Sequence, residues 1–394
     1  MRATLILMVG AAVAAADPKP GEEGTPEHQK ATALVKQLGD RRYATREAAA
    51  KQLIEMGPSA VPALTAGTKS EDEEVRNRSI ALLPQAKAAE WKRRAAAYLA
   101  DTEGKQKHDL PLLPEWDKLV GKPDAGSRKI YAEMLKTNGE FLQKADDYRL
   151  AAEACSKRCK EVLAQVRTHK GQIKAEIGDI AAILFVDTLV PKQSDWSSRA
   201  FPAHLLANPT VTESVDAADV GPILRRLIVK WVDVRPGQDF TAWQQFAVLA
   251  RKKPFAEAGP ALIKMAKNKS ADVFTVRVLA IEALGKVGGK DAAAALADLV
   301  SDSTSLFGGG QEENRVGDVA LAASLTMHGK KLNDFGMRNN FGIGFAAVEG
   351  EEPISITLHG FQNAAAREKA VKKWKEEVVA KKDEKKEEKK DDKK

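Results

Sequence analysis

Apolar residues recur at helical spacing along much of this chain, most clearly between residues 272 and 288. The positions that fall on one helical face there are Val276, Ala280, Ala283, Leu284 and Val287. Asp272 is suited to cap the start of such a helix, and Gly285 and Gly288 are suited to end it in a left-handed turn. The pattern therefore predicts a helix over this segment and a second helix from Asp291.

A related pattern lies near the N-terminus, over residues 31–83. It predicts a first helix, a second helix over 45–56 that ends at Gly57, and a third that begins Val61-Pro62-Ala63-Leu64. This third start matches Gly259-Pro260-Ala261-Leu262, which precedes the later copy. Because one repeat cannot bury its own apolar face, a second copy indicates that helix pairs stack on one another.

The next helix of the N-terminal copy has a strong start signal. Ser70 stands three residues before Glu73, which predicts a capping serine, and the acidic run from Glu71 to Glu74 suits the positive end of a helix dipole. Val75-Arg76 then corresponds to Val276-Arg277 in the later copy. The two copies therefore share both their apolar positions and one arginine.

These repeats resemble HEAT repeats of the bilin-lyase-like type. The resemblance implies antiparallel helix pairs stacked into a curved solenoid, and it implies no single activity. It also implies that arginines and acidic residues at matching positions pair between neighbouring repeats. The residues concerned are Asp72, Arg76, Asp272 and Arg277. We expect them to be structural rather than catalytic, since charged pairs between packed helices usually satisfy each other.

The end of the chain carries a second resemblance. Asp318-Val-Ala-Leu, Phe335-Gly336 and the stretch Arg367 to Trp374 resemble the closing segment of a group of exported bacterial HEAT-repeat proteins of unassigned activity. The glycine-rich residues 334–360 between them read mainly as loop, with one strand-like alternation from Ile354 to Leu358.

The predicted fold class is all-α, with HEAT-like repeats that form an α-solenoid, a central helical region, long loops and a disordered charged tail. Aromatic residues make up only 6% of the chain and alanine is abundant, which favours closely packed helices over a sheet sandwich. The expected divisions are a signal peptide at 1–16, N-terminal repeats at 28–100, a linker at 101–126, a central helical region at 127–190, a loop or joint at 191–217, a second repeat block at 218–305, a closing region at 306–375 and a tail at 376–394.

The first residues predict export. Arg2 is followed by an apolar run from Leu5 to Ala16 that closes on small residues, as in a cleaved secretory signal peptide, and is shorter than the roughly 20 residues that cross a bilayer. An uncleaved amphipathic start or a membrane tether is the alternative. No later segment is apolar for long enough to span a membrane. We therefore expect a mature protein that begins at Asp17 and is secreted, periplasmic or bound to the cell envelope.

The net charge of +7 does not indicate nucleic-acid binding. Positive and negative residues are interspersed, and Lys381–Lys394 alone holds eight lysines against six acids, which contributes +2. This low-complexity tail has no apolar anchor and is predicted to be disordered. Weak electrostatic attachment of the tail to an anionic envelope surface is an alternative to a merely solvated role.

Cys155 and Cys159 are the two cysteines of the chain, four residues apart on a predicted helix. A disulfide within the helix would be strained, because Cβ atoms at this spacing are about 5–6 Å apart and a disulfide needs about 3.8 Å. The sequence leaves open a bridge with local distortion, two free or buried thiols, or an intermolecular or metal-binding role.

Other reactive constellations are missing from the sequence. The six histidines are dispersed, and no zinc, haem-attachment or G-x-S-x-G motif occurs, so we expect no metal site and no cofactor. The leading hypothesis is an exported, non-enzymatic scaffold that mediates interaction with an unidentified protein partner in the cell envelope. The alternative is an enzyme with a site in the central helices, residues 128–250, for which Cys155 is the first candidate residue.

Overall fold

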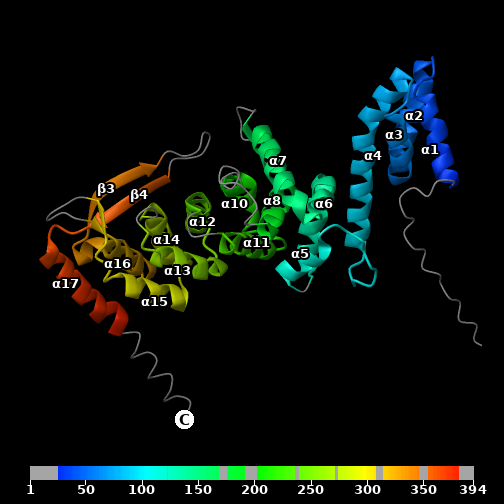
Figure 1. The fold of residues 1–394 in the computed structure, drawn as a ribbon. Helices are drawn as coiled ribbons and strands as arrows, with labels where there is room; N and C mark the ends of the chain where they lie inside the picture. The colour runs from blue at the N-terminus through cyan, green and yellow to red at the C-terminus, as the bar shows by residue number, and fades with distance from the viewer. Residues whose placement is uncertain are drawn as a thin grey trace, which may run out of the picture. The chain divides into compact units, whose positions relative to one another are not determined.

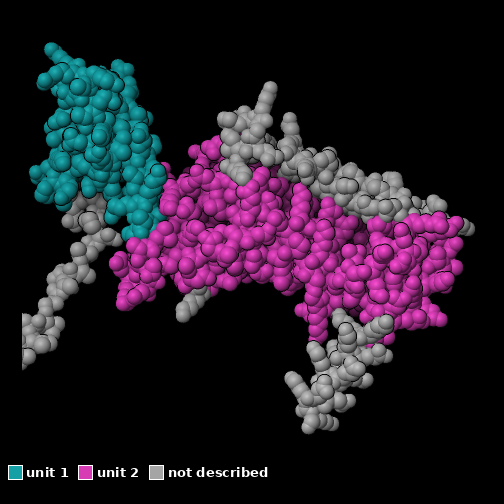
Figure 2. Space-filling model, turned by 180° about the vertical axis from the view of Figure 1, so that it is seen from behind, with its two compact units in different colours: residues 1–97 teal, residues 98–394 magenta. Residues whose placement is uncertain are grey.

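The structure is a computed structural model, and it describes residues 25–121, 123–167, 175–190, 202–235, 239–270, 274–307, 314–345 and 354–380. The chain divides into two compact units, Met1–Ala97 and Tyr98–Lys394 (Figure 2). The described residues are mainly helical, with very little sheet, which confirms the all-α fold class. None of the helices in these ranges combines the length and apolar character needed to cross a membrane.

The first unit contains the N-terminal repeats. Its elements are α1 (Pro26–Gln37), α2 (Tyr43–Met56), the 3₁₀ turn η1 (Gly57–Ala60), α3 (Val61–Gly67) and α4 (Glu73–Ala100), whose last residues belong to the second unit. Helix α1 packs on both α2 and α3. The core between them is aliphatic, with Leu38, Leu53 and Leu64 fully buried. The apolar positions predicted for this copy are therefore the ones that hold the helices together.

The loops before α2 and α4 are tied down by matching arginines. Arg76 Nη1 donates to the carbonyl oxygens of Ser70 (2.8 Å) and Glu71 (3.4 Å). Arg46 Nη1 makes the same two bonds six and five residues back, to the carbonyl oxygens of Asp40 (2.9 Å) and Arg41 (3.3 Å). Each guanidinium thus satisfies loop carbonyls that the helix itself leaves without donors.

Asp72, and not Ser70, caps α4. Asp72 Oδ1 accepts a hydrogen bond from the backbone amide of Val75 at 3.0 Å, and the Asp72 carbonyl accepts from the amide of Arg76. The prediction of a serine cap was therefore wrong by two residues. The Ser70 carbonyl is instead one of the acceptors of Arg76.

The second unit begins with central helices. These are α5 (Leu113–Val120), α6 (Ala125–Ala145), α7 (Tyr148–Arg167) and α8 (Ile177–Leu189), followed by η2 (Leu205–Ala207) and α10 (Pro209–Ser214). Helix α8 packs against α6, α7 and the later helix α11. The central helices and the second repeat block therefore form one compact unit.

Helix α8 is buried almost throughout its length, yet it carries two carboxylates. Near its start, Asp179 Oδ1 accepts from Arg158 of α7 at 2.7 Å and from Asn138 of α6 at 2.9 Å. Near its end, Asp187 pairs with the fully buried guanidinium of Arg235 and accepts from Trp231 Nε1 at 2.8 Å. An arginine from a neighbouring segment therefore neutralises each buried acid, as burial requires.

The second repeat block consists of successive helix pairs, α11 (Gly221–Asp233) with α12 (Phe240–Lys252), α13 (Gly259–Lys267) with α14 (Phe274–Val287), and α15 (Gly289–Leu299) with α16 (Val316–Met327). The short turn η3 (Ala256–Ala258) leads into α13. Helix α14 packs between α12 and α16, and α13 packs on α15, so two rows of helices run through the block (Figure 1). Each pair covers the apolar face of the next, as the repeat pattern predicts.

The two glycines near the end of α14 have different roles. Gly288 follows the helix with φ +70° and ends it, as predicted. Gly285 lies inside the helix, and a Cβ placed there would be 3.0 Å from the Cβ of Ala323 in α16. Gly285 thus lets α14 and α16 approach closely, and the expectation that it ends the helix was wrong.

The closing region contains small sheets as well as helices. Strands β1 (Ser305–Phe307) and β2 (Asn314–Arg315) form one antiparallel pair, and β3 (Arg338–Phe345) and β4 (Ile354–Gly360) form another. The weak alternation seen in the sequence is thus part of β4. The turn η6 (Leu332–Phe335) lies between α16 and β3, and helix α17 (Ala364–Trp374) follows β4 and continues into the π-helical turn η7 (Lys375–Ala380). Both α17 and η7 pack against α16 through a core that includes Leu325, Phe361 and Trp374.

Several predicted boundaries shift for identifiable reasons. The segment 101–126 contains α5, because Trp116 is fully buried there, and 191–217 contains α10. Helical structure continues through 376–380, since Val378 is buried in the closing core and Glu377 pairs with Lys330 at 2.9 Å. The predicted signal peptide at 1–16 and the tail from 381 onward lie outside the described residues.

The close approach of α8 to α6 gives a first prediction. A Cβ at Gly178 would lie 2.4 Å from the carbonyl oxygen of Glu133, so Gly178→Ala must push backbone apart and should lower the free energy of unfolding by about 1–3 kcal/mol. Gly259→Ala is the matched control, since its Cβ would meet nothing within 4 Å, and it should be neutral or stabilise by up to about 1 kcal/mol. Urea unfolding followed by circular dichroism measures both, and equal stability of the two variants would contradict the packing.

Candidate functional site

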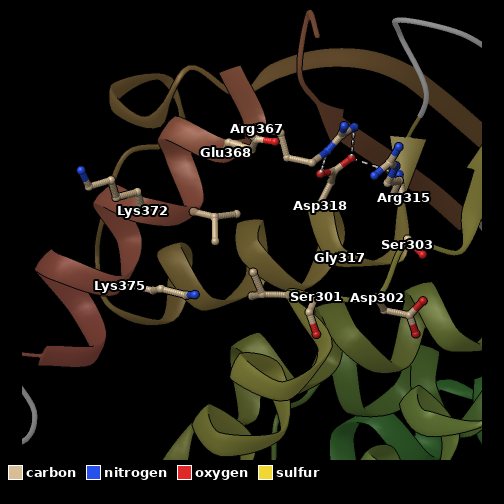
Figure 3. Close-up of a pocket in the computed structure, with 12 residues that line it drawn as sticks. Ser301, Asp302, Ser303, Arg315, Gly317, Asp318, Arg367, Glu368, Lys372 and Lys375 are labelled. Carbon is tan, nitrogen blue, oxygen red and sulfur yellow. Dashed lines mark hydrogen bonds and ion pairs between the residues drawn. The ribbon is translucent and has the colours of Figure 1, made fainter. Parts of the chain in front are cut away.

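A groove opens at the end of the second repeat block, between the loop after α15, the start of α16 and the closing helix α17 (Figure 3). Its cavity volume is about 400 Å³, which is within the usual range for ligand sites of roughly 300–1,000 Å³. Its lining residues are Val300, Ser301, Asp302, Ser303, Arg315, Gly317, Asp318, Arg367, Glu368, Val371, Lys372 and Lys375.

One wall of the groove is fixed by a buried ion pair between repeats. Arg277 of α14 donates through Nη2 to Asp302 Oδ2 at 2.6 Å and through Nε to the carbonyl of Ala266 at 3.0 Å. Burial alone would raise the pKa of Asp302, but hydrogen bonds from the hydroxyl and amide of Thr304 and from Arg277 outweigh it and lower the pKa to about 2. Asp302 is therefore an ionised structural anchor whose charge Arg277 neutralises.

The start of α16 is held against this wall by backbone contacts. The amide of Gly317 donates to the Asp302 carbonyl at 2.9 Å, and the amide of Val316 donates to the Thr304 carbonyl at 3.0 Å. A Cβ at Gly317 would lie 2.4 Å from the Val300 carbonyl oxygen, so only glycine fits this approach. These amides are already bonded, so any attraction for an anion must come from side chains rather than from this helix end.

The opposite wall, formed by α17, is held to α16 by a bidentate ion pair. Arg367 donates through Nε to Asp318 Oδ1 at 2.7 Å and through Nη2 to Asp318 Oδ2 at 3.0 Å. Further along the same helices, Trp374 Nε1 donates to the hydroxyl of Ser324 at 3.0 Å. Asp318 Oδ2 also accepts from the backbone amide of Arg315. These bonds fix the position of α17 across the groove.

The charges that remain after this pairing are mostly positive. Four cations and three carboxylates line the groove, and Asp318 is bonded to Arg367 while Asp302 is bonded to Arg277 from behind the wall. Arg315 has an interaction of its own, so the charged side chains that remain in the lining are Lys372, Lys375 and Glu368. Both lysines are exposed, and neither forms an ion pair with any residue in the described part of the chain. Figure 3 shows Lys375 reaching toward the wall that carries Ser301 and Lys372 pointing away, so the groove offers the ammonium group of Lys375 to a ligand.

The repeat residues singled out in the sequence are mainly structural. Arg277 is buried and pairs with Asp302 of the following repeat, while Asp272 lies outside the described residues. Arg76 bonds to carbonyl oxygens rather than to a carboxylate, and Asp72 caps α4. The resemblance implied that these arginines and acids pair between repeats. At the three of these positions that the structure describes, one arginine, Arg277, pairs with an acid, and that acid is Asp302.

Cys155 and Cys159 are free and buried on the face of α7 that meets α8. Burial raises the pKa of both thiols, that of Cys159 to about 12. Cys155 Sγ lies 3.6 Å from the carbonyl oxygen of Ile183, and the nearby charge of Arg235 only partly offsets the effect of burial. In the described part of the chain neither thiol bonds to a histidine or carboxylate that could act as its base.

Other site chemistries find little support in these ranges. No group of three His, Cys, Asp or Glu side chains among the described residues could hold a metal ion. The described tryptophans are all buried, so they pack in the cores rather than form a stacking platform, and Trp196 lies outside the described residues. His108 bonds to Asp101 at 3.0 Å and packs edge-on against the ring of Tyr98.

The sequence missed the groove because its walls come from three separated segments. Arg367 and Asp318 lie in the stretches that resemble a closing segment, but nothing in their spacing shows that they pair. The sequence did contain one indication of the groove lysines. The apolar face of the closing helical segment consists of Ala370, Trp374 and Val378, and Lys372 and Lys375 fall between these positions. This periodicity places both lysines off the core-facing side.

Comparison with known proteins supports the repeat assignment. Residues 276–302 match the family described as PBS lyase HEAT-like repeat. The matched segment runs from α14 through α15 to Asp302, so it spans both members of the Arg277–Asp302 pair. No curated protein matches the chain. The fold and this match together support HEAT-like repeats in this chain.

Loss of the Asp302 carboxylate should destabilise the repeat block. Asp302→Ala leaves Arg277 buried without its partner, which should lower the free energy of unfolding by about 3–5 kcal/mol. The double variant Arg277→Met with Asp302→Ala should lose less than the sum of the two single changes, because no unpaired charge remains. Urea unfolding of all four proteins measures this coupling, and strictly additive losses would contradict it.

The same pair sets a pH dependence. Because the folded pKa of Asp302 (about 2) is below its ordinary value of 3.8, this stabilisation is complete above about pH 4 and is lost as the pH falls toward 2. In Asp302→Asn, which has no carboxyl group to protonate here, the free energy of unfolding should fall less between about pH 4 and pH 2 than in the unchanged protein.

The two thiols should be present but unreactive in the folded protein. We expect a thiol reagent to label neither cysteine in the native state and both after denaturation without reductant, because burial disfavours the reactive thiolate. Mass spectrometry counts the labels. Two extra labels that appear only after reduction would show a Cys155–Cys159 bridge and contradict this state.

Proposed function

We propose that this HEAT-like repeat protein is an exported, non-enzymatic scaffold that binds another protein in the cell envelope. The observation that carries the proposal is the groove beside α17, a cavity of about 400 Å³ toward which Lys375 reaches without an ion-pair partner in the part of the chain that the structure describes. The stacked helix pairs supply a rigid frame, since each pair is packed against the next. Binding by surface complementarity requires only such a frame and a groove with uncommitted charges.

The chemistry of the groove favours binding over catalysis. Its carboxylates Asp302 and Asp318 are held by Arg277 and Arg367, so they are anchors rather than proton carriers. A general acid or base needs a pKa near the working pH, and the pKa of Asp302 is far below it. Cys155, the first candidate of the enzyme hypothesis, is buried and its pKa is raised. These features support a scaffold.

A photo-cross-linking experiment tests the proposal. With benzoylphenylalanine in place of Lys375, whose side chain reaches toward the wall that carries Ser301 (Figure 3), ultraviolet light should produce a discrete adduct with one envelope protein. The same replacement at Lys369, an exposed lysine of α17 outside the groove lining, should produce little or none. Adduct mass and identity are read by gel electrophoresis and mass spectrometry.

The same sample tests export. The N-terminal peptide of the protein recovered from the envelope fraction should begin at Asp17, in agreement with signal-peptide cleavage. No adduct from any groove position, or a protein that stays in the cytoplasmic fraction with Met1 attached, would overturn the proposal.

A further inference from the structure

We infer that two copies of this chain pair through strand β3, antiparallel and about a two-fold axis at Ile343, so that their two hairpins form one four-stranded sheet. The inference is independent of the proposed function, since it concerns the hairpin of β3 and β4 and not the groove beside α17. It follows from the outer edge of β3, from the residue pattern along that strand and from the position of its one charge.

Strand β3 has one neighbour among the described strands. It pairs with β4 in an antiparallel ribbon in which Ile343 stands opposite Ile356 (Figure 1). Strand β4 also contacts β2 and α16, whereas β4 is the one described element that makes extensive contact with β3. The second edge of β3 therefore carries backbone amides and carbonyls that no strand in the described ranges pairs with. Such an edge is a template for another strand.

This edge lacks the usual features that prevent pairing. Natural sheets protect an open edge with charged residues, with proline or with a bulge. The bulge of this ribbon lies between Asn339 and Phe341, near the start of β3. From Phe341 to Phe345 the strand has no charged residue and no proline. Because a two-stranded ribbon is only marginally stable by itself, further strands at this edge would stabilise it.

The residues of this segment read the same in both directions, Phe341-Gly-Ile343-Gly-Phe345. In an antiparallel pair centred on Ile343, each phenylalanine stands opposite a phenylalanine of the second copy, each glycine stands opposite a glycine, and Ile343 stands opposite Ile343. A contact between two identical copies about a two-fold axis has to be self-complementary in this way. A strand from an unrelated protein would not require the symmetric pattern, so a second copy is the favoured occupant.

The register of the ribbon extends this match to the faces of the sheet. Alternate residues of a strand belong to one face, and the large apolar residues of both strands alternate in phase. They are Phe341, Ile343 and Phe345 of β3, with their register partners Leu358, Ile356 and Ile354 of β4. Pairing about Ile343 continues the same face across all four strands. A slip of one residue would put the apolar positions of the two copies on opposite faces.

The one charge in β3 favours the antiparallel orientation. Arg338 stands at the start of the strand, five residues before Ile343. In the two-fold pair the two copies of Arg338 are therefore about ten positions apart, or about 33 Å at the rise of a strand. This separation is well beyond the Debye length of about 8 Å at physiological ionic strength, so the two charges barely repel. A parallel pair in register would place the two arginines side by side.

Pairing should stop at two copies. Once the two β3 strands meet, the outer strands of the sheet are the two copies of β4, and each contacts β2 and α16 of its own chain. No second β3 edge remains for a third copy, so the assembly is closed. One strand pair buries less surface than a standard interface, and the dimer should therefore be weak and depend on protein concentration.

Sedimentation velocity of the full-length protein tests the inference. Over about a hundredfold range of concentration the protein should pass from monomer to dimer. Ile343→Lys brings two like charges together at the axis and should lower the association constant about tenfold or more. Ile356→Lys is the matched control on the same ribbon. Its copy in the dimer is three strand spacings away, about 14 Å, so the association constant should fall less than about threefold.

Charge complementation at the axis gives a result that misfolding of one variant cannot imitate. Ile343→Glu should weaken self-association as Ile343→Lys does. An equimolar mixture of the two variants should recover the dimer, because opposite charges then stand directly across from each other. Circular dichroism should show that each variant keeps the helical content of the unchanged protein.

Four outcomes would overturn the inference. They are a protein that stays monomeric at every concentration, a dimer that Ile343→Lys does not weaken, an assembly that keeps growing beyond two copies, and an equimolar mixture that gives no recovery. Equal loss of the dimer in a folded Ile356→Lys variant would place the contact elsewhere on the ribbon and would also overturn it. Recovery in the mixture, with each variant monomeric alone, would establish the two-fold pairing at Ile343.

Discussion

Each helix pair in this protein has an apolar face that only another pair can cover, and the rest of the structure depends on this constraint. Within the second repeat block, α14 meets the need by packing between α12 and α16. At the end of the stack no further pair follows α16, and α17 with η7 covers its apolar face through Trp374 and Val378. This cover is a single helical segment rather than a helix pair. The groove lies where α17 and the loop after α15 leave a space, so the site follows from how the stack ends.

Arginine side chains add polar contacts between segments that the apolar contacts bring together. The Arg277 guanidinium joins the end of α13 to the loop after α15, Arg367 joins α17 to α16, and Arg235 neutralises the buried end of α8. The planar, multiply donating guanidinium suits this task because it can satisfy several acceptors at once and stays charged when buried. Such pairs add modest net stability but fix which segments meet. In the groove they also pair with Asp302 and Asp318, whereas Lys375 forms no ion pair with any residue that the structure describes.

Periodicity in the sequence was enough to predict the helices and the two repeat copies, because it reports directly which side chains are buried. Periodicity could not predict the role of a residue whose main contact lies far away in the sequence. Gly285 was interpreted as a helix end, although it is a contact point with α16. The arginine of the later repeat was predicted to be structural, but its partner Asp302 could not be inferred, since their meeting depends on the path of a loop. The groove was hidden for the same reason, because Arg315 and Lys375 lie on its lining far apart in the chain.

The most direct measurement of the central claim is hydrogen exchange of α16 after its covering helix is loosened. Trp374→Ala removes the largest side chain that α17 contributes to the core shared with α16. The amides of α16 should then exchange faster with solvent, while those of α1 should exchange at an unchanged rate. Unchanged protection of α16 would contradict the account.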